Sequence, residues 1–172
     1  DSCGDDSAEG YGNCDSVWRS YDNGDTWERV FHGNWADDGS PWKDDVDGSD
    51  ELLLRLPCDV DEECCTLYMG VKDVGGDMTQ VFYTRDCGQC WSSAQRQKVV
   101  IQDFAVSAEN VTHVLNEAGE VSTSTQYGRR PADEVDTDVG SGYDITSCCE
   151  EGLLVVGGQH GEEVAYSEDD GE

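Results

Sequence analysis

Carboxylates alternate around a glycine in the stretch Asp45-Val46-Asp47-Gly48-Ser49-Asp50-Glu51. Oxygen ligands spaced in this way on a short loop are typical of sites that wrap Ca²⁺. The stretch does not have the twelve-residue spacing of an EF-hand, and a solvated acidic loop is the alternative interpretation. Calcium is therefore the only cofactor that the sequence suggests, with Asp45, Asp47, Asp50 and Glu51 as candidate ligands.

The residue types that most often carry catalysis do not form a recognisable set. The three histidines, His32, His113 and His160, are scattered, and we expect surface or turn positions for them rather than metal ligation or general-base catalysis. The sequence has no Ser-His-Asp pattern, phosphate-binding loop or zinc motif. We therefore expect no enzymatic activity, and a glycoside hydrolase with an unrecognised carboxylate pair is the enzyme alternative.

The charge balance of the 172-residue chain is extreme. It carries 10 basic and 39 acidic side chains, a formal net charge of −29. Phosphate binding needs Lys and Arg on a common face, so nucleic acid is excluded as a natural partner, and anionic membranes are disfavoured. No apolar run reaches transmembrane length, so we expect no membrane insertion. The acidity fits a solvated surface in salty or extracellular water, or carboxylates that collect divalent cations.

Nine cysteines in so short a chain, without zinc-like spacing, indicate an oxidising compartment. The disulfide candidates are Cys3, Cys14, Cys58, Cys64, Cys65, Cys87, Cys90, Cys148 and Cys149. We interpret Cys87-Gly88-Gln89-Cys90 as a short structural disulfide within a turn rather than a redox pair, because the βαβ context of a redox motif is absent. Asn110 begins a glycosylation sequon, which is consistent with an extracellular or cell-surface location.

One eight-residue pattern recurs along the chain and organises it. The first copy is Ser20-Tyr21-Asp22-Asn23-Gly24-Asp25-Thr26-Trp27. The stretch from Thr84 to Trp91 has a hydroxyl residue, an Asp, a Gly and a Trp at the same offsets, and stretches beginning at Ser124 and Ser167 match more loosely. Each copy follows a run rich in β-branched and aromatic residues. An Asp that accepts backbone N–H groups and a Gly with positive φ predict a tight β-hairpin at each copy. The positions concerned are Ser20, Asp22, Gly24, Thr26, Trp27, Thr84, Asp86, Gly88, Trp91, Ser124, Gly128, Ser167, Asp169 and Gly171.

This pattern resembles the Asp-box, or BNR repeat, of the sialidase-like and Vps10-like β-propellers, Ser/Thr-x-Asp-x-Gly-x-Thr-Trp. In that family it lies between the third and fourth strands of a blade and holds a turn. The resemblance implies an all-β fold of propeller blades, each a four-stranded antiparallel meander with an Asp-box turn. Sialidases also use an arginine triad, yet no arginine here lies in the Arg-Ile-Pro context of those enzymes, so the resemblance does not extend to their activity.

The spacing of the pattern predicts the blade boundaries. Thr84 and Ser124 are 40 residues apart and Ser124 and Ser167 are 43 apart, a period typical of blades. We predict a single repeat domain that is a partial or open propeller. Its parts are a partial first blade (1–31), an acidic insertion (32–51), a second blade (52–97), a third blade (98–140) and an incomplete fourth blade (141–172).

Open strand edges favour self-association, because an unpaired edge templates further strands. The sequence thus predicts a secreted or cell-surface structural protein, such as a surface-layer or extracellular-filament subunit. The alternative is a propeller module that binds glycans or proteins.

Overall fold

The computed structural model describes residues 16–32, 51–57, 65–72, 78–93, 100–125, 127–128, 133–147, 152–158 and 164–168. These residues are almost entirely β, with one 3₁₀ turn, η1 (Ala108–Asn110). Within them, no helix is long and apolar enough to span a membrane.

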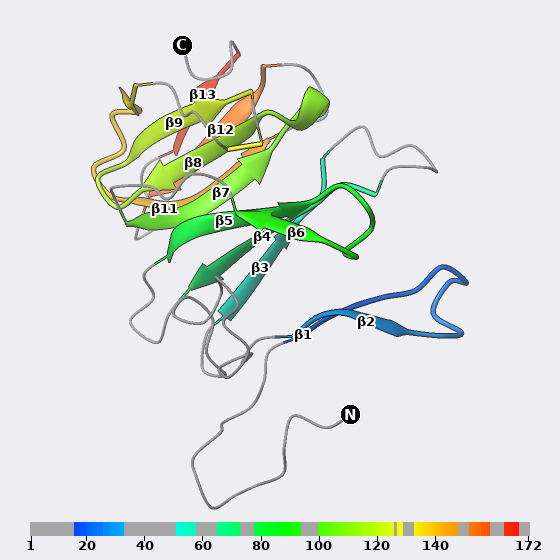
Figure 1. Cartoon of the computed structure of the whole chain (residues 1–172). Helices are drawn as coiled ribbons and strands as arrows, with labels where there is room; N and C mark the ends of the chain where they lie inside the picture. The colour runs from blue at the N-terminus through cyan, green and yellow to red at the C-terminus, as the bar shows by residue number, and fades with distance from the viewer. Residues whose placement is uncertain are drawn as a thin grey trace, which may run out of the picture.

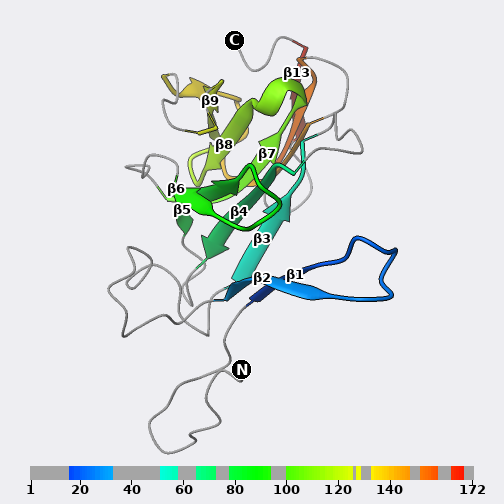
Figure 2. The ribbon, with the colours of Figure 1, turned by 45° about the vertical axis from the view of Figure 1, so that its right-hand side comes forward.

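The strands form successive antiparallel hairpins and meanders, which we call blades (Figures 1 and 2). The first blade contains β1 (Ser16–Arg19) and β2 (Glu28–His32). The second contains β3 (Glu51–Arg55), β4 (Leu67–Lys72), β5 (Met78–Thr84) and β6 (Trp91–Ser93). The third contains β7 (Ile101–Val106), β8 (Thr112–Asn116), β9 (Glu120–Ser124) and β10 (Val135–Asp136). The fourth contains β11 (Gly142–Ser147), β12 (Leu154–Gly158) and β13 (Val164–Ser167). The predicted all-β, four-stranded meander is therefore confirmed in the second and third blades.

Two strands differ from the sequence prediction. The sequence predicts a strand at the apolar run from Val99 to Ile101, whereas the first strand of the third blade runs from Ile101 to Val106. Asp103 interrupts the apolar pattern, yet it is buried because an arginine pairs with it. The two-residue strand β10 was missed, since an exposed strand of that length has no periodicity to detect.

The core lies between the blades. Val17 of the first blade packs with Met69, Val71 and Phe82 of the second. Tyr68, Val81 and Tyr83 of the second blade pack with Ile101, Phe104, Val106 and Val114 of the third. Ala105, Leu115 and Val121 of the third blade pack with Val139, Ile145 and Val156 near and within the fourth. Because neighbouring residues of a strand point to opposite faces, the second and third blades bury both faces of their sheets.

Candidate functional site

The backbone adopts the same conformation in three copies of the repeated turn. Positive φ occurs at Asn23 (56°) and Gly24 (95°), at Cys87 (57°) and Gly88 (90°), and at Tyr127 (56°) and Gly128 (74°). Two successive residues with positive φ are what a type I′ hairpin turn requires. We call the turns at 20–27 and 84–91 the first and second turns, and the turn beginning at Ser124 the third turn.

In the first turn, Asp22 is the acceptor that organises the loop. Thr26 donates to its carboxylate from its hydroxyl at 2.6 Å and from its backbone N–H at 2.8 Å, and the Ser20 hydroxyl donates at 2.8 Å. These donors favour the ionised form and lower the pKa of Asp22 to about 2. The ring of Trp27 closes back over the loop, where its Nε1–H donates to the carbonyl oxygen of Gly24 at 3.0 Å.

The second turn repeats this arrangement with different donors. Asp86 accepts from the backbone N–H of Cys90 at 2.8 Å and from the Thr84 hydroxyl at 2.7 Å. Both hydrogen bonds, with that from Cys90 the stronger, lower the pKa of Asp86. The carboxylates of both turns therefore accept hydrogen bonds from donors within their own turns, which indicates a structural role.

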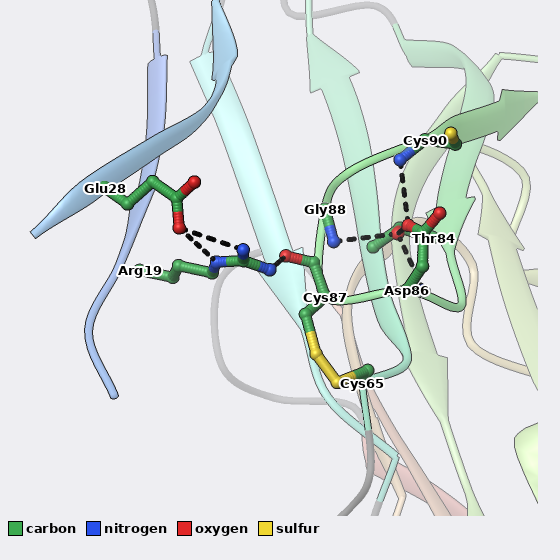
Figure 3. The surroundings of a disulfide bond; sticks show 8 residues. All are labelled: Arg19, Glu28, Cys65, Thr84, Asp86, Cys87, Gly88 and Cys90. Atoms are coloured by element: carbon green, nitrogen blue, oxygen red, sulfur yellow. Dashed lines mark hydrogen bonds and ion pairs between the residues drawn. A yellow bond between two sulfur atoms is a disulfide. The ribbon is translucent and has the colours of Figure 1, made fainter. Parts of the chain in front are cut away.

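A disulfide and an arginine connect the second turn to its surroundings (Figure 3). Cys87 is bonded to Cys65, which lies just before β4. Arg19 of the first blade donates to the carbonyl oxygen of Cys87 and forms an ion pair with Glu28 at 2.9 Å. The residue before the glycine of the turn is thus one of the points at which the first blade contacts the second.

The predicted Cys87–Cys90 disulfide is wrong. Cys87 pairs with Cys65, and Cys90 is a free, exposed thiol. Its sulfur points away from the disulfide in Figure 3. A hydrogen bond to Asp86 raises the pKa of Cys90, so this thiol is a poorer nucleophile than an ordinary one.

The third turn contacts the preceding blade in the same way as the second. Tyr127 stacks on Tyr83 of the second blade, with ring centroids 5.0 Å apart, and the guanidinium of Arg85 lies over its ring. Of the loosely matched fourth copy, only Ser167 and Glu168 are described, because Asp169 and Gly171 lie outside the described residues.

An ion pair and its partners connect the first strands of three blades. Arg55 on β3 contacts Asp103 on β7 at 2.8 Å. The backbone N–H of Ile145, on β11, donates to the other oxygen of Asp103 at 3.1 Å. Burial, and then a hydrogen bond with Asp144, raise the pKa of Asp103 to about 6, against the opposing effect of Arg55. Sequence reasoning missed this cluster because its members are far apart in the chain.

His113 does not occupy the surface or turn position that was predicted for it. It lies in β8 and is fully buried. Its ring nitrogens are 3.0 Å from the hydroxyls of Ser107 and Thr123, one on each side. The histidine satisfies its hydrogen-bonding groups inside the third blade, which is a structural arrangement.

A groove of about 200 Å³ lies between the third and fourth blades. Val121, Leu154 and Val156 contribute its apolar lining, and Asp136 and Asp138 lie along one wall. Both aspartates are exposed, and Asp136 accepts the backbone N–H of Asp138 at 2.9 Å.

The wall of this groove is anchored to the β8–β9 turn. Thr137 donates from its hydroxyl to the carbonyl oxygen of Gly119 at 2.6 Å. A Cβ on Gly119, whose φ is +86°, would overlap the carbonyl oxygen of Val139. The chain from Thr137 to Val139 therefore lies directly on a turn that only glycine fits.

Among the residues that the structure describes, the fourth blade has one covered and one uncovered face. Ile145, Val156 and Ala165 are aligned across its three strands and pack toward the third blade. On the opposite face, Val164 is 70% exposed and Tyr166 is 72% exposed. Gly157, which pairs with Val164, has open space around the position of a Cβ.

Other predicted site residues are not tested by the structure. Of the calcium candidates, Asp45, Asp47 and Asp50 lie outside the described residues, and Glu51 is described only as the first residue of β3. The described residues contain no metal-binding group of three or more His, Cys, Asp or Glu side chains. Asn110 is half-buried, and its Oδ1 accepts the hydroxyl of Tyr68 at 3.3 Å. Its glycosylation stays a prediction.

Comparisons with known proteins support the fold. No protein-family model matches this sequence, and no curated protein matches it in sequence. Among solved structures, the chain is similar to YCF48 bound to a D1 peptide, with a TM-score of 0.52 and 14% sequence identity. The match covers 88% of this chain and 43% of that chain, so this chain spans less than half the length of YCF48. The predicted fold class, an all-β partial propeller, is confirmed.

Proposed function

We propose that this chain is an Asp-box propeller of the sialidase-like superfamily that acts as a structural assembly protein, secreted or on the cell surface. The Asp-box assignment is supported by the hydrogen bonds of Asp22 and Asp86, which place the carboxylate at the centre of each turn. The assembly role rests on one observation, the uncovered face of the fourth blade.

This face is where a further blade would pack. The second and third blades bury both faces of their sheets against neighbours. In the fourth blade, Val164 and Tyr166 present large apolar side chains to solvent on the same face. A second copy that covers this face with a different surface makes a head-to-tail contact, which leads to rings or filaments.

The carboxylates support an assembly role better than a hydrolytic one. Asp103 is buried, which keeps its carboxylate away from a substrate. Asp103 is also committed to Arg55 and to the backbone of Ile145. We therefore propose no enzymatic activity.

The disulfide and the acidity support an extracellular location. Cys65–Cys87 is the kind of bond that persists in an oxidising compartment. The net charge of −29 makes copies repel one another at low ionic strength, so association should strengthen as salt screens the charge. Calcium held by the stretch from Asp45 to Glu51 would act in the same direction.

The test is sedimentation velocity of the chain over a concentration series, at low salt and at 0.5 M NaCl, with electron microscopy of the same samples. We expect concentration-dependent oligomers that increase with salt. A variant with Val164→Asp and Thr146→Asp places two charges on the uncovered face and should remain monomeric.

The matched control is Leu56→Asp with Thr125→Asp, which adds the same charge at exposed positions outside the fourth blade. Equal association of the two variants, or a monomer under all conditions, would contradict assembly through this face.

A second candidate function is protein binding. It is favoured by the groove between the third and fourth blades, together with the similarity of the fold to YCF48, a structure that holds a peptide. Glycan binding is the other form of this alternative, and a glycan array in calcium-containing buffer tests it.

A further inference from the structure

We propose that the groove between the third and fourth blades binds a peptide segment in which a large apolar side chain is followed or preceded by lysine or arginine. This inference develops the protein-binding candidate. The groove and the uncovered face share Tyr166, whereas Ala165, Asp136 and Asp138 belong to the groove, so variants at these three positions test it separately from assembly. Ala165 faces the third blade, where the groove lies, whereas its neighbour Val164 points to the uncovered face.

The size of the groove and its aliphatic residues favour an amino-acid side chain over a drug-sized organic ligand. Its volume of about 200 Å³ is below the roughly 300–1,000 Å³ typical of small-molecule sites. Five of its ten lining residues are aliphatic: Val121, Val135, Leu154, Val156 and Ala165. A branched aliphatic or aromatic side chain would remove this apolar surface from water.

The charge of the groove favours a cation beside that side chain. Asp136 and Asp138 lie along one wall, and no Lys or Arg is among the lining residues. Both carboxylates belong to exposed residues, so the charged group of a lysine or arginine can reach them without desolvation. An anionic partner would meet these two charges and the overall charge of −29.

The backbone at the groove can also hold an extended peptide. β10 (Val135–Asp136) is the terminal strand of its sheet in the described residues, and it pairs with β9 on one side. An extended segment can pair with such an edge, which is a common mode of peptide recognition. The contact of Thr137 with Gly119 holds the adjoining wall in place before any ligand binds.

The experiment is selection of random heptapeptides displayed on phage against the whole chain in 150 mM NaCl, followed by fluorescence anisotropy with the enriched peptides. We expect enrichment of an apolar residue next to Lys or Arg. The variant Ala165→Phe fills the groove without changing charge, and it should weaken binding at least tenfold. Its fold is checked by its melting temperature.

A second pair of variants separates the groove from general attraction to an acidic protein. The double variant Asp136→Asn with Asp138→Asn removes two charges. An Asn at 136 keeps the Oδ1 atom that accepts the backbone N–H of residue 138, and an Asn at 138 tolerates the positive φ of that position. We expect binding about three- to tenfold weaker. The control, Asp133→Asn with Glu134→Gln, removes two neighbouring charges outside the groove and should change binding less than twofold.

The inference is overturned if no peptide is enriched, if enriched peptides carry no basic residue, or if a folded Ala165→Phe variant binds them normally. Glycan binding that is lost in Ala165→Phe, without peptide binding, would assign the groove to sugars instead and would also overturn it. None of these outcomes affects the sedimentation test, so the two proposals fail separately.

Discussion

The first and second turns have the same internal geometry but different environments. In both, an Asp accepts from a backbone N–H four residues later at 2.8 Å, and a Gly has a φ of 90° or more. Trp27 is 60% exposed and bonds to its own turn, whereas the Nε1–H of Trp91 donates to Val30 of the first blade at 3.1 Å. The turn is therefore specified locally, and its contribution to the fold depends on the neighbour it contacts.

The largest expected difference is at the two glycines. A Cβ on Gly88 would lie 2.7 Å from the Cβ of Val30, whereas a Cβ on Gly24 would meet only the Trp27 ring at 3.7 Å. Gly88→Ala should reduce the free energy of unfolding by about 3 kcal/mol or more, through overlap and an unfavourable φ together. Gly24→Ala should reduce it by about 1 kcal/mol, from the φ alone. Urea denaturation of both variants measures the gap, and equal losses would contradict the environment argument.

The disulfide is the next largest difference, since the first turn has none. Cys65 and Cys87 are 22 residues apart, and a loop of that size corresponds to about 3 kcal/mol of stabilisation. Cys65→Ser with Cys87→Ser should lose about this amount in urea denaturation. Cys90→Ser, at the exposed thiol, is the control and should change stability by less than about 0.5 kcal/mol. A comparable loss in Cys90→Ser would favour the Cys87–Cys90 pairing, because both variants would then remove the same bond.

Substitution of the two tryptophans, Trp27 and Trp91, should give a smaller difference in stability. Trp91 packs edge-on against Phe31, with ring centroids 5.6 Å apart, and is half-buried. Trp91→Ala should cost about 2 kcal/mol, and Trp27→Ala less than about 1 kcal/mol. Thermal melting of the two variants, each compared with the parent chain, provides the measurement. A larger effect at Trp27 would show that its ring has a partner outside this chain.

The stability contributed by Asp22 and Asp86 of the two turns should depend on pH in the same direction, whereas that contributed by the buried Asp103 should depend on pH in the opposite direction. Asp22 and Asp86 have lowered pKa values, so their stabilisation is present above about pH 4 and is lost as the pH falls, for Asp22 toward its pKa of about 2. Asp103, raised to about 6, has the opposite sign: its stabilisation is full below its unfolded pKa of about 4 and is lost as the pH rises through 6. We expect the decrease in stability that Asp103 causes between about pH 4 and 6 to disappear in Asp103→Asn, as measured by urea denaturation. An unchanged slope would show that another group titrates there.

The parts of the fold that could be predicted from the sequence are those set by nearby residues. Ser20, Asp22 and Gly24 interact within four positions of one another, so their spacing alone reveals the turn. Repetition of that spacing then gave the blades. The pairing of Cys65 with Cys87 could not be predicted, because it depends on how β4 lies beside the second turn.

The interior cluster and the groove were missed for the same reason. Arg55 and Asp103 are 48 residues apart, and nothing near either one indicates the other. A charged residue within β7 instead interrupts the apolar pattern and shifts the predicted strand. The groove exists only because two blades meet, and the exposed residues Asp136 and Asp138 resemble any other acidic loop in this sequence.

The contacts of Asp103 also determine how the third and fourth blades can move. Asp103 holds the backbone of Ile145, and the hydroxyl of Ser147 donates to the carbonyl oxygen of Val106 at 2.9 Å, so the first strands of these blades are fixed to each other. Their last strands, β10 and β13, line the groove and share no backbone pairing in the described residues. Any rotation between the two blades therefore has its axis near β7 and β11 and its greatest displacement at the groove.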